Sequence, residues 1–231
     1  MRTVSALLVL AGLVAGLAAC APRIPPPDEM SERDERLTER IEAAAPADLD
    51  RTLEEILREQ GEYSPSACQA LTDAGVIVIY RDDAKTSVRY FERALAACEA
   101  VYGHEHRETS YALHDYGEAQ VRAAGERYEP RARPWYEEAL AVRRRVLGDQ
   151  HEETAAAEVS LGEHLLASCR AQPPCPADDS RLERASTLAR HALQVFNSVK
   201  VPKLNNRLNA NKLLSDVVAQ RGLAASESPA H

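Results

Sequence analysis

Two short stretches decide the fold, WYEEAL at 135–140 and LGDQHEET at 147–154, because both have counterparts elsewhere in the chain. The segments YFERAL at 90–95 and YGHEHRET at 102–109 precede them by 45 residues. Self-similarity at a spacing of roughly 20–50 residues is typical of stacked supersecondary units. Helix-favouring residues dominate the composition, and only 10 of the 231 residues are glycine. We therefore predict an all-α chain of repeated helical hairpins.

A glycine recurs near the middle of the first helix of each expected hairpin, at Gly75, Gly117 and Gly162. Glycine in a helix interior costs about 1 kcal/mol relative to alanine. Its recurrence predicts that a neighbouring helix packs closely against the backbone at these three positions.

The repeated turn resembles that of tetratricopeptide repeats in the longer form, of about 42 residues, found in kinesin light chain-like proteins. That form carries Leu-Gly-x-x-His-Pro-x-Thr between repeats; here Glu152 replaces the proline in one copy, and Tyr102 and Arg107 replace the leucine and proline in the other. The resemblance covers residues 64–197 and implies a right-handed helical-hairpin solenoid. The three antiparallel pairs that it implies are 64–80 with 84–101, 107–124 with 129–147, and 152–170 with 180–197.

The sequence divides the whole chain into four expected regions. We expect a signal peptide at 1–19, a proline-rich tether with a charged linker at 20–45, the repeat domain at 46–222 and a disordered tail at 223–231. The linker carries only a thin apolar stripe, which predicts a weak or mobile helix. Residues 203–222 predict a capping helix, because the last apolar face of a solenoid must be covered.

The N-terminus has the layout of a secretory signal peptide, in which Arg2 precedes an apolar run at 4–14 and small residues that end at Cys20. The final Leu-Ala-Ala-Cys resembles the lipobox of bacterial lipoproteins, which implies cleavage before Cys20 and acylation of that cysteine. One alternative is a transmembrane anchor, although positions 4–19 are fewer than the roughly 20 residues that a spanning helix needs. A plain secretory signal is another alternative.

This N-terminus implies a location in the bacterial cell envelope. Ala21, not Asp, follows Cys20. In enterobacteria-like lipoproteins that implies sorting to the outer membrane, facing the periplasm. The prolines at 22–27 favour an extended spacer between lipid and domain. The net charge of -8 and the lack of a basic run argue against nucleic acid as a partner.

Four cysteines remain if Cys20 carries a lipid, and an exported protein can form disulfides. Cys68 would begin the first helix of one hairpin and Cys98 would lie near the end of its antiparallel partner. Cys169 would end a later helix, with Cys175 in the loop that follows. We hypothesise the pairs Cys68–Cys98 and Cys169–Cys175, with buried free thiols as the alternative. The absence of Cys-x-x-Cys disfavours a zinc site.

The sequence contains no nucleophile elbow, phosphate-binding glycine loop or His-Glu-x-x-His motif. His106 and His151 occupy the same slot in two repeats, and we interpret them as part of the framework. We therefore expect no catalytic residue, metal or cofactor. The alternative is an enzyme or metal-binding accessory protein with a site around His151 and His164.

In the resembling family, side chains of the first helices line a groove that holds a peptide or a partner helix. Acidic residues outnumber arginine among the candidates, which favours a partner with basic character. We expect a non-catalytic adaptor or scaffold, tethered to a membrane by its lipid, that binds a protein or peptide. A pilot-type lipoprotein for an outer-membrane secretin or pilus is the alternative. The candidates are Leu71, Thr72, Val78, Tyr111, His114, Asp115, Glu118, Arg122, Glu158 and His164.

Overall fold

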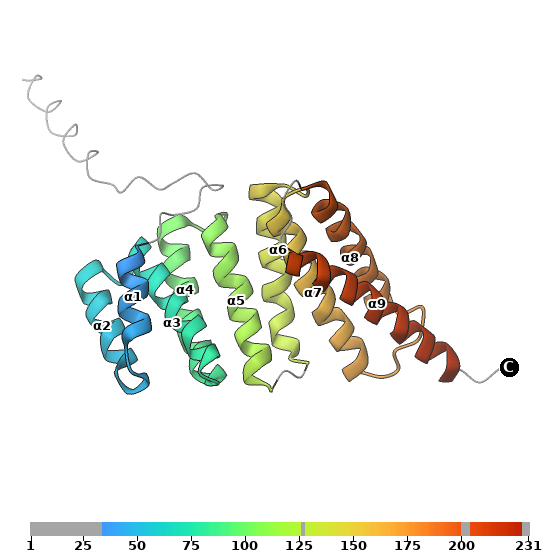
Figure 1. Cartoon of the computed structure of the whole chain (residues 1–231), viewed down its shortest axis with the longest axis horizontal. Coiled ribbons are helices and arrows are strands. Elements are labelled where there is room, and N and C mark those ends of the chain that lie inside the picture. The colour runs from blue at the N-terminus through green and yellow to red at the C-terminus, as the bar shows by residue number, and fades with distance from the viewer. Residues whose placement is uncertain (1–33, 126–127, 200–203, 228–231) are drawn as a thin grey trace, which may run out of the picture.

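The computed structural model describes residues 34–125, 128–199 and 204–227, where all regular structure is helical (Figure 1). The predicted signal peptide, Cys20 and the proline-rich tether lie outside these residues. None of the helices in the described ranges has the length and apolar character needed to cross a membrane. In chain order the elements are α1 (Glu35–Ala43), the 3-10 helix η1 (Pro46–Asp48), α2 (Leu49–Gln60), α3 (Pro65–Tyr80), α4 (Ala84–Tyr102), α5 (Arg107–Ala123), the 3-10 helix η2 (Pro130–Ala132), α6 (Arg133–Leu147), α7 (Glu152–Ala171), α8 (Ser180–Ser198) and α9 (Leu204–Glu227).

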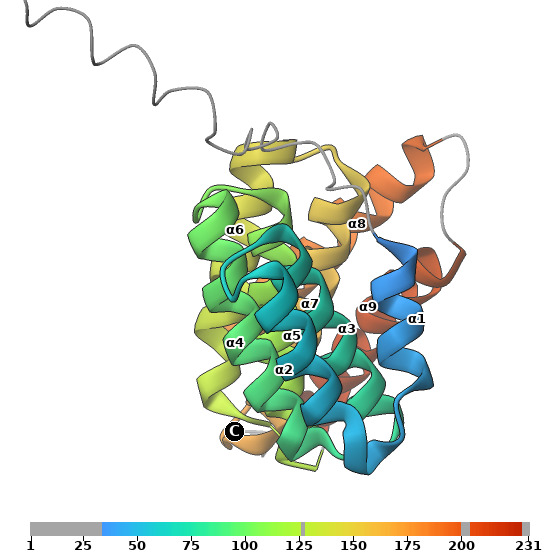
Figure 2. The same ribbon diagram turned by 90° about the vertical axis from the view of Figure 1, so that its left-hand side faces the viewer.

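The helices stack as consecutive hairpins along one axis, each packed against the next (Figure 1). Seen along that axis, α4 and α6 lie on one side and α1 and α9 on the other, with α3, α5 and α7 between them (Figure 2). Each helix of the row therefore contacts its own hairpin partner and the adjacent hairpin. This arrangement confirms the predicted all-α solenoid and its three central hairpins.

One predicted helix begins later than expected, at Arg133 instead of residue 129. A helix from 129 would place Pro134 in its interior, where the ring lacks an N–H donor and clashes with the preceding turn. The chain instead forms η2 first, with the Glu129 side chain accepting a hydrogen bond from the Arg131 backbone N–H at 3.0 Å. Pro134 then falls in the first turn of α6, where it is tolerated.

The two repeated histidines begin helices. The Nδ1 atom of His106 accepts a hydrogen bond from the backbone N–H of Glu108 at 3.1 Å, and that of His151 accepts one from Glu153 at 3.2 Å. These bonds satisfy N–H groups that have no partner within the first turn of a helix. Both histidines thus serve as N-caps of α5 and α7.

The repeated threonines hold the same turn from the other side. The Thr109 hydroxyl donates to the Gly103 carbonyl at 2.7 Å, and the Thr154 hydroxyl donates to the Gly148 carbonyl at 2.9 Å. The two glycines have φ of +83° and +87°, a left-handed region that favours glycine. The repeated motif is therefore a turn framework, as the sequence indicated.

The three repeated mid-helix glycines face neighbouring helices, as predicted. A Cβ atom at Gly75 would lie 2.7 Å from the Phe91 ring, and one at Gly162 would lie 2.5 Å from a Leu213 methyl group. At Gly117 the nearest atom would be 3.3 Å away. The close approach is therefore tightest at the first and third glycines.

The helical body begins before the predicted boundary at residue 46, because the expected linker contains α1, a helix packed against α3. Its Leu37 and Ile41 side chains, one turn apart, are buried. The Thr38 hydroxyl donates to the Asp73 carboxylate on α3 at 2.8 Å. Two apolar residues form only a weak amphipathic pattern, which by itself does not predict a stable helix. Packing against α3 stabilises α1.

The α1–α2 pair forms a further hairpin before the three predicted ones. On α2, Asp50 and Glu54 each pair with an arginine of α4, Arg89 and Arg93, at 2.8 Å. Both helices of this hairpin pack on α3, and the two ion pairs join α2 to α4.

At the other end of the row, α9 covers the last hairpin and buries Ala210, Leu213 and Val217. It ends at Glu227, five residues beyond the predicted capping helix, so the expected disordered tail does not begin at residue 223. No proline stands between Gly222 and Glu227, and the alanines there favour helix.

Candidate functional site

A stripe of polar side chains runs along the exposed side of α5. Glu118 follows the adjacent residues His114 and Asp115 by four and three positions, and Arg122 follows Glu118 by four, a spacing that places them along one side of the helix. Side chains of α3 and α7 flank this stripe. We call this surface the α5 groove, and it consists of Val76, Ile79, Tyr80, Asp82, His114, Asp115, Glu118, Arg122, Ser160 and Glu163.

The α3 side of the α5 groove is a hollow of about 320 Å³. Val76 and Tyr80 keep 38% and 84% of their surface exposed, although both are large apolar side chains. Phe91 of α4 lines the hollow from beneath and is buried. The hollow is therefore apolar on the α3 side, while Asp115 and Glu118 line it on the α5 side.

Two hydrogen bonds fix the Glu118 carboxylate. Arg122 donates from Nε to Oε1 at 2.8 Å, and the Tyr136 hydroxyl donates to Oε2 at 2.9 Å. Burial of the Tyr136 ring raises the pKa of its hydroxyl, and the nearby Glu118 carboxylate raises it further. Tyr136 therefore remains a neutral donor at neutral pH, and it holds Glu118 in place.

A histidine connects α5 to α7 across the groove. His114 hydrogen-bonds through Nε2 with the Ser160 hydroxyl at 3.0 Å and through Nδ1 with the Asp115 carboxylate at 3.1 Å. The first helices of two adjacent hairpins are thus joined by a polar bridge at the centre of the groove.

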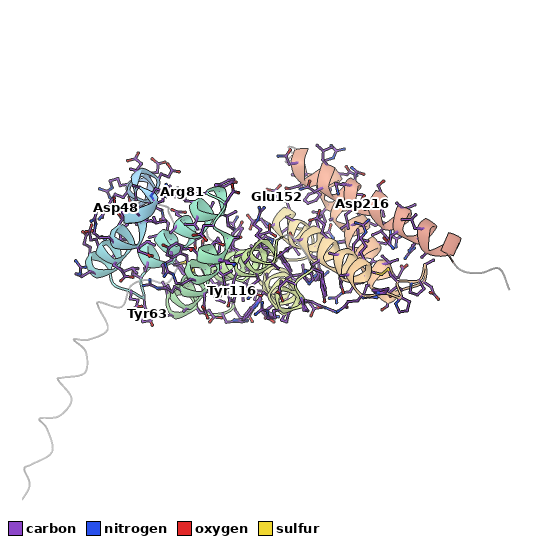
Figure 3. All side chains as sticks on the ribbon, turned by 90° about the horizontal axis from the view of Figure 1, so that it is seen from below. Asp48, Tyr63, Arg81, Tyr116, Glu152 and Asp216 are labelled. Atoms are coloured by element: carbon purple, nitrogen blue, oxygen red, sulfur yellow. A yellow bond between two sulfur atoms is a disulfide. The ribbon has the colours of Figure 1, made fainter. Side chains whose placement is uncertain are left out.

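Glu163 extends the acidic surface onto α7. Its side chain is accessible to solvent, yet the surrounding helices displace enough water to raise the pKa of its carboxyl group. Lys212 of α9 opposes this rise, whereas Glu118 and Asp216 add to it. Figure 3 shows Asp216 on α9, the helix that lies beside α7.

The structure brings four of the ten predicted groove residues together, namely His114, Asp115, Glu118 and Arg122. The other six lie elsewhere or inside the protein. Leu71 and Val78 are core residues with 1% and 5% exposure, so their assignment to the groove is wrong. A solenoid helix contacts both its partner and the adjacent hairpin, which leaves only one narrow exposed stripe.

Glu158 is also wrongly assigned to the groove, because it is completely buried. Its carboxylate accepts hydrogen bonds from Arg144 on α6 and from Nδ1 of His191 on α8, both at 2.7 Å. One buried carboxylate thereby joins three helices. Its role is to hold adjacent hairpins together.

His164 is the fourth candidate that proves to be buried, with 5% exposure. Its ring packs between those of Tyr128 and Tyr136, at centroid distances of 5.1 and 5.3 Å. Among the described residues its Nε2 atom has no hydrogen-bond partner. Burial lowers the pKa of His164, and the positive charge of Arg133 lowers it further.

Tyr111 and Thr72 are half-buried, and their contacts hold the helices rather than line the groove. The Arg143 guanidinium lies 4.6 Å from the Tyr111 ring centre, and burial raises the pKa of the Tyr111 hydroxyl to about 12. The Thr72 hydroxyl donates to the Cys68 carbonyl within α3 at 2.8 Å.

The structure contains two disulfides, in the pairing hypothesised from the sequence. Cys68 on α3 and Cys98 on α4 have Cα atoms 4.9 Å apart. Cys169 on α7 and Cys175 in the following loop have Cα atoms 5.3 Å apart. The first disulfide joins the two helices of one hairpin, and the second closes a short loop.

The part of the chain that the structure describes has further hollows outside the α5 groove, of which we consider two. The larger, about 600 Å³, is bordered by α6, α7 and α8 and includes Arg144, Glu158 and His191. Its buried carboxylate is already bonded to both basic groups. The second, about 360 Å³, lies near the ends of α4 and α5. The described residues include no group of three or more side chains able to hold a metal ion.

Six of the ten groove residues were not predicted from the sequence: Val76, Ile79, Tyr80, Asp82, Ser160 and Glu163. Val76 and Tyr80 have the same one-turn spacing as Glu118 and Arg122. The sequence feature that could have indicated this surface is Tyr80, a large aromatic residue at the end of α3. Only the stacking of α3 beside α5 shows that these residues share a surface.

Comparisons with known proteins agree with this geometry. The tetratricopeptide repeat family matches residues 68–108 and 129–153. The structure is similar to that of a Podosopora anserina putative kinesin light chain with nearly identical TPR-like repeats, with a TM-score of 0.57, 16% sequence identity, and coverage of 83% of this chain and 86% of the other.

A variant of that protein with one substituted residue gives a TM-score of 0.58 at the same identity and coverage. No curated protein matched the sequence. The repeat matches and the hairpin stacking together show that the chain folds as an all-α solenoid of tetratricopeptide-like repeats.

Proposed function

We propose that this protein is a non-catalytic adaptor of the bacterial cell envelope, tethered to a membrane by a lipid on Cys20, that binds a protein partner through the α5 groove. The observation that carries the adaptor role is the exposed, partly apolar hollow between α3 and α5, the first helices of two adjacent hairpins. Repeat solenoids use such extended surfaces to bind other proteins. An exposed apolar patch rimmed by polar groups is typical of an interaction site.

The tether is supported by the N-terminal sequence. The Leu-Ala-Ala-Cys ending and the proline-rich segment after it fit a lipid anchor followed by a spacer. Confinement to a membrane would raise the local concentration of the adaptor near envelope partners. A groove contact of modest affinity would then be sufficient.

Site-specific crosslinking in the native envelope tests the adaptor role. A photo-crosslinking phenylalanine analogue would replace Tyr80, an exposed residue of the groove. The matched control places the same analogue at Tyr63, whose side chain is 63% exposed before α3 begins. We expect a dominant crosslinked protein from position 80 and not from position 63. Equal, diffuse crosslinking from both positions would contradict the proposal.

Lipid labelling tests the tether separately. We expect wild-type protein to incorporate a labelled fatty acid and to fractionate with membranes. The Cys20→Ala variant is expected to lose the label and to remain unprocessed. Normal labelling of that variant would rule out Cys20 as the lipid site, while leaving the groove results unaffected.

A further inference from the structure

The α5 groove has two chemically different halves that lie side by side. The apolar half consists of Val76, Ile79 and Tyr80 on α3. Tyr80 alone leaves 84% of its surface in contact with water. A ligand that covers this ring would remove its surface from water. Burial of apolar surface contributes about 25 cal/mol per Å². This half therefore favours an apolar side chain.

The other half carries more carboxylates than cations. Arg122 pairs with Glu118, and Lys212 pairs with Asp216 at 2.7 Å. These two pairs use Arg122 of α5 and Lys212 of α9, while the charge of the buried Arg143 acts on Asp115 from within the protein. Glu163 forms no ion pair among the described residues.

Glu163 therefore leaves negative charge on the groove, and the Asp115 carboxylate, which Arg143 offsets only through space, adds to it. Within the described part of the chain, the Asp115 carboxylate has only the hydrogen bond with His114. Glu163 is partly desolvated, with the charges of Glu118 and Asp216 acting on it. A cation placed here would restore the solvation that the helices displace, and its attraction would be stronger than in open water.

We infer that the α5 groove binds a short peptide segment in which an apolar side chain stands next to a lysine or arginine. The apolar side chain enters the hollow beside Tyr80, and the cation lies over Asp115 and Glu163. This inference rests on the proposed adaptor function and specifies the chemistry of its partner.

The charge of the chain argues against other occupants. An acidic peptide or a nucleic acid would bring negative charge to a surface that already has an excess. A second copy of this chain, at a net charge of -8, would have to overcome repulsion of the same sign. A basic, partly apolar segment of another protein is the occupant that both halves favour.

Selection from a displayed library of random short peptides tests this chemistry with the purified full chain. We expect the enriched peptides to combine a lysine or arginine with a neighbouring leucine, isoleucine, valine or aromatic residue. Affinity of a selected peptide should fall by about threefold to tenfold in Glu163→Gln and in Tyr80→Ala. Added salt should weaken binding, because the charged part of the contact is exposed.

Two variants serve as matched controls. Glu92→Gln removes one exposed carboxylate from α4, and Tyr63→Ala removes one exposed tyrosine outside the groove. Both should bind the selected peptides like wild type. Enriched peptides that are acidic or uncharged, equal losses in the controls, or the lack of any enriched peptide would each overturn the inference.

Failure of the inference differs from failure of the adaptor function. Position 80 could crosslink an envelope protein whose recovery is unchanged by Glu163→Gln. The adaptor role would then stand, and the inference that the groove binds a lysine or arginine of its partner would be wrong. If no protein crosslinks at position 80, the adaptor role itself fails.

Discussion

The Phe91 ring of α4 lies directly against Gly75 of α3, so close that a Cβ atom at position 75 would come within 2.7 Å of the ring. Phe91 is 1% exposed, so neighbouring side chains restrict its ring. The same ring forms the base of the hollow beside Tyr80. The glycine that permits tight packing of the first predicted hairpin therefore also shapes the candidate binding surface.

This contact predicts that Gly75→Ala destabilises the protein. Alanine gains about 1 kcal/mol of helix propensity over glycine, but overpacking a core typically costs about 1–3 kcal/mol. We expect a net loss of up to about 2 kcal/mol in the free energy of unfolding, measured by urea denaturation. Gly117→Ala is the matched control, because its Cβ atom would lie 3.3 Å from its nearest neighbour. An equal loss in both variants would contradict the packing argument.

The disulfides predict two different losses of stability. In the chain-entropy description, the constraint on the unfolded chain grows with the length of the closed loop. The cysteines of Cys68–Cys98 are 30 residues apart, and those of Cys169–Cys175 are 6 apart. Replacing each pair by serine should cost about 3.5 and about 2 kcal/mol respectively.

The bonds themselves are checked by intact mass without reductant. Two disulfides should lower the mass of the protein by that of four hydrogen atoms relative to the reduced form. Four free thiols in freshly purified, unreduced protein would show that neither disulfide forms.

Glu158 should be far more important for stability than an exposed glutamate. Removing its carboxylate in Glu158→Ala abolishes two charge-assisted hydrogen bonds, to Arg144 and His191. Arg144 and His191 are partly exposed and can be rehydrated, so we expect a loss of about 2–4 kcal/mol in the free energy of unfolding. Glu105, paired with Arg145 on the surface, is the control, and Glu105→Ala should cost less than about 1 kcal/mol. Similar losses would mean that the buried pair contributes no more than a surface one.

His164 predicts a loss of stability in mild acid. Its pKa in the folded protein is below the ordinary value of 6.5, because burial disfavours the charged ring. The unfolded chain therefore binds the proton more readily, and stability present above pH 6.5 declines as the pH falls toward the folded pKa. The slope should approach about 1.4 kcal/mol per pH unit. His164→Phe, which keeps a ring between Tyr128 and Tyr136, should flatten this decline.

A second histidine provides a control of opposite sign. Hydrogen bonds to the Glu138 and Glu99 carboxylates raise the pKa of His104, so its contribution is present below pH 6.5 and is lost as the pH rises. His104→Gln should therefore remove a gain in stability that wild type shows as the pH falls to 6.5, and it should leave the decline below pH 6.5 unchanged. Unfolding curves at a series of pH values from about 7.5 to about 5 compare the three proteins, and an unchanged decline in His164→Phe would contradict the assignment.

The sequence by itself determined the repeat, its turns and its hairpins. Those features depend on local chemistry: Gly148 supplies a left-handed turn, His151 caps the next helix and Thr154 closes the turn. Each acts within a few residues, so the pattern of residue types is sufficient to predict it. The disulfide pairing hypothesised for Cys68 and Cys98 followed in the same way, from the antiparallel arrangement of one hairpin.

The binding surface was decided only by the tertiary structure. Glu158 and Glu163 both lie on α7, yet one is buried in a three-helix ion-pair cluster and the other faces the groove. Val78 and Tyr80 likewise lie two residues apart on α3, one in the core and the other 84% exposed. Helical spacing limits which residues share a face, but the neighbouring hairpins decide which face is covered. The short helix α1 is stable for the same reason, because its two buried apolar side chains gain their partners only when the hairpins stack.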